Sequence, residues 1–88
     1  MRGLGKFVIA RQLAGKILVS NDGEGIGRLV DIMVNEITGK ITGLIVEPSP
    51  DSLSARKMRK EDGLIVIPYS AVLAVGDYVI LDKKALGA

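Results

Sequence analysis

Residues 16–47 read KILVSNDGEGIGRLVDIMVNEITGKITGLIVE and hold three apolar runs separated by two turns. The runs are residues 16–20, 26–35 and 41–47. The turns contain Asn-Asp-Gly and Thr-Gly-Lys, residue types that tolerate positive φ or close hairpins. Apolar residues alternate in the middle run, which predicts Val30, Ile32 and Val34 on one face of a strand. This stretch therefore predicts three consecutive strands.

Further apolar runs extend the pattern on both sides. They are FVIARQL at residues 7–13, LIVIP at 64–68 and YVIL at 78–81, with one helical turn expected at 69–72. Short, regularly spaced strands with hairpin turns are typical of barrels and sandwiches. We expect an all-β fold, a small six-stranded antiparallel β-barrel, because an open sheet of this size would leave two exposed edges.

One long polar connection, residues 48–63, interrupts the strands. It predicts either a loop or a short helix over residues 53–60, capped by Asp51 or Ser52. The expected organisation is an N-terminal tail at residues 1–6, a single domain at 7–82 and a frayed C-terminal tail at 83–88.

The composition excludes several kinds of chemistry. The chain has 88 residues, a net charge of +2, and no Cys, His or Trp. Disulfides, thiolate chemistry and His-based catalysis are therefore impossible. The Gly23–Gly27 pattern GxGxG is followed by a strand pattern and not by a helix, so it predicts a hairpin turn and a bulge. We expect no catalytic residue, metal or cofactor, and an enzyme only if two Asp side chains converge in a pocket.

The chain shows no membrane-spanning signal. None of its apolar runs approaches the roughly 18 residues of a transmembrane helix. Residues 1–19 are basic and partly apolar, but Arg11 and Lys16 interrupt the apolar stretch, which argues against a signal peptide. We expect a cytoplasmic protein.

Three strands are apolar on both faces, whereas a small barrel has only one interior. This surplus of apolar strand surface predicts a homo-oligomer, with a dimer favoured. The alternative is that residues 48–63 and the C-terminal tail cover the extra face. The residues expected at the oligomer contact are Leu18, Ile65, Ile67, Val79 and Leu81.

A basic cluster lies in the long connection: Arg56, Lys57, Arg59 and Lys60. Such a cluster could bind an acidic protein or the phosphates of RNA. Three neighbouring carboxylates, however, favour a solvated loop with internal ion pairs. The three aromatic residues lie in apolar contexts, which disfavours base stacking on RNA.

Residues 15–46 and 64–81 resemble a PRC-barrel domain. The resemblance rests on Gly-Lys before an apolar strand, Asp-Gly and Ile-Gly, a strand holding Asp31, a Thr-Gly turn, and IPYSAV followed by VGDYVIL. It covers about residues 7–82 and is greatest to small stand-alone archaeal members. Other members include the cytoplasmic domain of the photosynthetic reaction centre H subunit and the C-terminal domain of the ribosome maturation factor RimM.

The resemblance implies a six-stranded barrel that works by protein–protein contact and carries no catalytic residue. Our first hypothesis is a self-associating adaptor, in archaeal cell division or in a membrane-associated complex. The alternative is an RNA-linked role in ribosome assembly or RNA processing, as the likeness to the maturation factor suggests.

Overall fold

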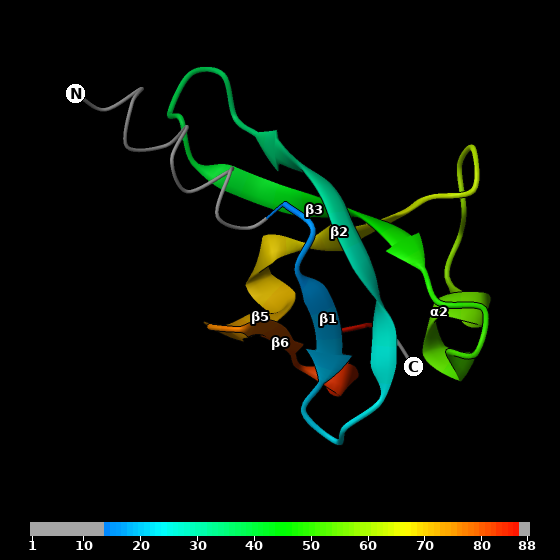
Figure 1. The fold of residues 1–88 in the computed structure, drawn as a ribbon. Coiled ribbons are helices and arrows are strands. Elements are labelled where there is room, and N and C mark those ends of the chain that lie inside the picture. Colours follow the sequence, from blue (N-terminus) through cyan, green and yellow to red (C-terminus); the bar gives the residue numbers. More distant parts are fainter. Residues whose placement is uncertain (1–13, 87–88) are drawn as a thin grey trace.

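The computed structural model describes residues 14–86, in which six strands form one sheet in the order β4-β3-β2-β1-β6-β5 (Figure 1). The strands are β1 (Ile17–Ser20), β2 (Gly25–Val34), β3 (Ile41–Pro48), β4 (Ile65–Pro68), β5 (Val72–Val75) and β6 (Tyr78–Leu81). A short helix, α2 (Leu53–Lys57), and two 3-10 turns, η1 (Tyr69–Ala71) and η2 (Lys83–Leu86), complete the described fold.

The all-β fold with six strands is confirmed, but two details differ from the expectation. β6 lies beside β1 in parallel, so the sheet is mixed and not wholly antiparallel. Within residues 14–86 the sheet does not close, because β4 and β5 are its two edges. The predicted strand at 7–13 and the tail at 1–6 lie outside the described residues. The helical turn expected at 69–72 is η1, and it is followed by β5, a strand that the sequence reading missed.

The pairing of β2 with its two neighbours shifts register at three places, one of them between Met33 and Val34. The first lies opposite Leu18 and Val19, within the Gly23–Gly27 pattern, and confirms the predicted turn and bulge. The second leaves Val30 without a register partner between Leu29 and Asp31. The bulge inverts the alternation, so that Leu29 is buried and Val30 is exposed. The prediction that Val30 shares the face of Ile32 is therefore wrong.

The core is aliphatic, and its buried residues come from β1, β2, β3, β4 and β6 together with α2 and η1. Its buried members are Leu18, Ile26, Leu29, Leu44, Val46, Ala55, Ile65, Ile67, Ala71, Val79 and Leu81. All five residues predicted at the oligomer contact belong to this set, with exposed fractions of 0–1%. They pack inside their own chain and cannot touch a second copy. The continuous apolar runs arise because the opposite faces of the same strands are also apolar.

The long connection contains the predicted short helix, although α2 is shorter than 53–60. The Ser52 hydroxyl caps it by accepting a hydrogen bond from the Ala55 backbone N–H at 3.0 Å. At its other end, the Lys60 ammonium donates to the Ala55 carbonyl at 3.1 Å. The C-terminal residues 83–86, which we expected to fray, form η2, and Leu86 packs against the core.

Candidate interaction surfaces

Glu24, in the turn between β1 and β2, holds together three segments that are distant in sequence. Its carboxylate accepts hydrogen bonds from the Ser54 backbone N–H at 3.0 Å and from the Ser52 and Ser54 hydroxyls at 2.8 Å each. The Lys83 ammonium lies 3.0 Å from the same carboxylate. One side chain thus joins the β1–β2 turn, the start of α2 and the start of η2.

The electrostatics of this cluster keep every member charged. Hydrogen bonds from the Ser54 backbone and the Ser52 hydroxyl, with Lys83 close by, lower the pKa of Glu24 to about 2. Lys83 and then the Ser20 hydroxyl lower the pKa of Asp22. The two carboxylates in turn raise the pKa of Lys83. We interpret the cluster as structural, because its side chains bond to one another and to the start of α2 in the same chain.

Two further carboxylates, Asp31 and Asp82, bond to backbone N–H groups close to them in sequence. Asp31 is exposed, and its side chain accepts a hydrogen bond from the Ile32 backbone N–H at 2.8 Å. Asp82 caps the start of η2 by accepting from the Lys84 N–H at 3.1 Å. In the part of the chain that the structure describes, no group of three or more acidic side chains could hold a metal ion.

The basic cluster sits on α2 and the connection after it. Its four side chains are all exposed. Lys60 bonds to backbone carbonyls of α2, and the Arg56 guanidinium donates to the Pro50 carbonyl at 3.3 Å. The ion pairs found within residues 14–86 involve Arg28 and Lys83, and none involves this cluster. The internal ion pairs expected for this segment are therefore not formed.

A second exposed surface is apolar and lies on β5, β6 and β1. Leu73 and Val75 of β5 are 56% and 47% exposed, and Tyr78 of β6 is 53% exposed. Tyr78 is the register partner of Ile17, which is 42% exposed on β1. With Ala74 these residues form what we call the β5 surface: Ile17, Leu73, Ala74, Val75 and Tyr78.

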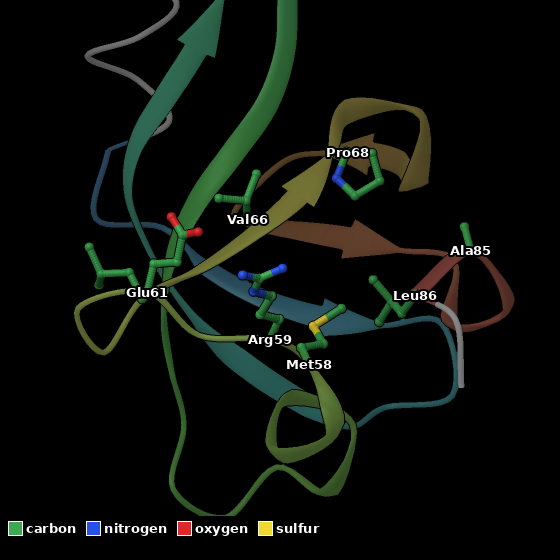
Figure 2. A pocket seen from close by; sticks show the side chains of 8 residues that line it. Met58, Arg59, Glu61, Val66, Pro68, Ala85 and Leu86 are labelled. Carbon is green, nitrogen blue, oxygen red and sulfur yellow. The ribbon is translucent and has the colours of Figure 1, made fainter.

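A third feature is a groove of about 410 Å³ along β4 (Figure 2). Figure 2 shows Met58 and Leu86 directed towards each other on one side and Val66 and Pro68 of β4 on the other. Arg59 and Glu61 place both signs of charge in its lining. We call this feature the β4 groove; its lining residues are Met58, Arg59, Glu61, Leu64, Val66, Pro68, Ala85 and Leu86.

Comparison with known proteins identifies the family. The model of the PRC-barrel domain matches residues 6–86. The chain is also 35% identical, over 77 residues, to an uncharacterized protein of Methanocaldococcus jannaschii, covering 88% of this chain and 83% of the relative. The chain therefore belongs to the PRC-barrel family, and its relative comes from an archaeon, as the sequence resemblance implied. Among residues 14–86, moreover, no helix is long and apolar enough to cross a membrane.

The basic cluster is exposed, as the sequence predicted. The apolar side chains predicted at the oligomer contact are instead buried in the core. The sequence reading missed the β5 surface because Val72 was assigned to a helical turn at 69–72 and no strand was predicted at residues 73–75. The signal was present: Val72 to Val75 is a β-prone run that ends at Gly76-Asp77, a typical turn pair. It also missed Glu24, whose partners lie 28–59 positions away in the sequence.

Proposed function

We propose that this chain is a non-enzymatic interaction module that associates with itself and holds a second protein. The observation that supports this most is the β5 surface. Its large apolar side chains are about half exposed, although the core is complete without them. Several exposed large apolar side chains on neighbouring strands of a small chain are typical of contact sites.

The same chain offers a separate surface for a different partner. The basic cluster and the β4 groove adjoin each other, because Arg59 belongs to both and Met58, next to it in sequence, also lines the groove. α2 and β5 lie at opposite sides of the molecule (Figure 1). A module of this kind can therefore be bound on two sides at once. The most concrete version is a cytoplasmic adaptor in archaeal cell division or in a membrane-associated complex.

The alternative is an RNA-linked role in ribosome assembly or RNA processing through the basic cluster. We favour it less, because two of its four cations, Arg56 and Lys60, already bond to backbone carbonyls of the same segment. Lys57 and Arg59 remain for phosphates, which is a small number for binding driven by counterion release.

The test is affinity purification of the tagged chain from its source organism, with and without nuclease, over a series of salt concentrations. We expect a stoichiometric protein partner that survives nuclease and high salt. A matched variant, Lys57→Ala with Arg59→Ala, separates the two functions. RNA that is lost from this variant, and lost from the wild type with a log–log salt slope of magnitude roughly 1.5 to 2, would support the alternative. A monomer without any protein partner would contradict the proposal.

A further inference from the structure

The free edge of β4 is protected against pairing with another strand. Leu64 and Glu61 exchange two backbone hydrogen bonds of 2.9 Å, so the edge is already paired where the strand begins. Because backbone groups alternate along a strand, those of Val66 and Pro68 point to the same side as those of Leu64. Pro68 has no N–H to donate. Charged Arg59 and Glu61 line the groove beside this edge.

The free edge of β5 carries few of these devices. Within residues 14–86, β5 pairs only with β6, and it contains neither Pro nor a charged residue. Residues 64–76 as a whole carry no charge. A register shift between Val72 and Ala74 marks a bulge at Leu73. Bulges re-aim side chains, and here the side chain turned to solvent is large and apolar. The strand is short and bulged, and the Val72 N–H already donates to the Tyr69 carbonyl, but the rest of this edge is uncharged, apolar and open to pairing with another strand.

We propose that two copies of this chain pair through the edges of β5, about a two-fold axis, into a closed dimer. The proposal rests on the self-association in the proposed function and assigns it a surface. The difference between the edges determines the geometry. A β5 edge that met a β4 edge would build an open chain of subunits, whereas β5 against β5 closes after two copies. Because the β4 edge is protected against pairing, the arrangement that remains is the closed dimer of β5 against β5.

A second copy suits this surface better than an unrelated partner, because the edge is complementary to itself. Because the strand carries no charge, two copies of this edge can run antiparallel without opposing like charges. The paired edges would join the two sheets into one continuous sheet, with β6 and β1 of each copy lying outwards from the β5–β5 contact. The basic cluster, on the other side of the molecule from β5, stays free for the second partner (Figure 1).

The first test places a charge on each edge in turn. Leu73→Lys puts like charges close together across the two-fold axis, and we expect it to weaken the dimer by roughly 100-fold. Val66→Lys is the matched control, because Val66 is 52% exposed on β4 and Leu73 is 56% exposed on β5. We expect it to leave the dimer intact. Light scattering over a dilution series should give twice the 9.3 kDa chain mass for wild type and Val66→Lys, and the single-chain mass for Leu73→Lys.

The second test guards against a variant that simply unfolds. Leu73→Glu alone should also be monomeric, but an equimolar mixture with Leu73→Lys should form a heterodimer, visible by native mass spectrometry. Dimers of wild type that Leu73→Lys does not weaken would overturn the β5 assignment and leave the proposed function standing. A mixture that stays monomeric would also overturn it. A monomeric wild type would contradict both the assignment and the self-association.

Discussion

β4 and β5 are the two edges of one sheet, and they differ in almost everything that controls association. β4 ends in Pro68, begins in a closed turn with Glu61, and borders a groove with charged side chains in its lining. β5 is four uncharged residues, three of them exposed. The difference shows how a short chain can leave one edge for contact while it protects the other. A protein with two open edges would polymerise or aggregate.

The largest expected effect concerns the two faces of β4. Ile67→Ala should lower the free energy of unfolding by about 3 kcal/mol, because it empties a fully buried site. Val66→Ala, one residue earlier and half exposed, should change it by less than about 0.5 kcal/mol. Urea denaturation at a fixed chain concentration measures both. Equal effects would mean that β4 does not form the wall of the core.

The next effect concerns the cluster that anchors α2 beside β1 and η2. Glu24→Gln should lower stability at neutral pH by about 2 kcal/mol, since a charged acceptor of several hydrogen bonds is lost. Glu24 has its pKa lowered in the folded state from 4.5 to about 2. Its contribution is therefore full above about pH 4.5 and is lost as the pH falls towards 2.

Denaturation between pH 7 and pH 2 measures this dependence. The wild type should lose stability as the pH falls below 4.5, and Glu24→Gln should lose less. The matched control is Glu47→Gln, which removes a carboxylate that pairs with Arg28 at 2.7 Å but is more than half exposed. That control should cost less than about 1 kcal/mol. Parallel pH profiles for wild type and Glu24→Gln would refute the role assigned to Glu24.

A smaller effect concerns the turn that closes the start of the β4 edge. Asp62 and Gly63 both have positive φ, at 53° and 79°, as a two-residue type I′ hairpin requires. Gly63→Ala should cost about 1 kcal/mol, because a side chain is strained in this conformation while no atom crowds the position. Gly76→Ala is the matched reference, because Gly76 is equally uncrowded but does not have a positive φ. Thermal denaturation that shows no difference between these variants would contradict the turn assignment.

The smallest expected effect on stability concerns Pro68 at the β4 edge, where a substitution should instead change how the chains associate. Pro68→Thr restores a backbone donor on the free edge of β4 and should alter unfolding by less than about 1 kcal/mol. If Pro68 protects this edge, the variant should show species larger than a dimer in light scattering at high concentration. An unchanged mass distribution would show that the groove residues protect β4 without help from Pro68.

The sequence predicted most of the fold because its signals are local. Turn residues at Asn21 to Gly25 and around Gly39, and β-branched runs between them, are sufficient to place β1, β2 and β3. The Ser52 cap of α2 was also readable. What failed depends on tertiary pairing. The bulge at Val30 reverses the expected faces of β2, and the parallel pairing of β6 with β1 has no signature in either strand.

The sequence predicted that an apolar contact surface exists, but not which residues form it. A surplus of apolar strand residues indicated contact with another chain, but alternation within LIVI or YVIL does not reveal which face points inwards. Ile65 and Ile67 are in the core and Val66 is outside, although all three look alike in sequence. The partners of Glu24 were not predictable, because folding alone brings Ser54 and Lys83 together.

The central claim, that two copies meet at β5, is tested most directly by cross-linking. The chain has no cysteine, so one introduced cysteine is unique. Leu73→Cys, Ala74→Cys and Val75→Cys sample the β5 edge, and Val66→Cys samples β4. A disulfide needs Cα atoms within about 7 Å. Under mild oxidation we predict a covalent dimer from at least one β5 variant and none from Val66→Cys. A dimeric protein in which no β5 variant cross-links, or in which Val66→Cys does so equally, would contradict the account.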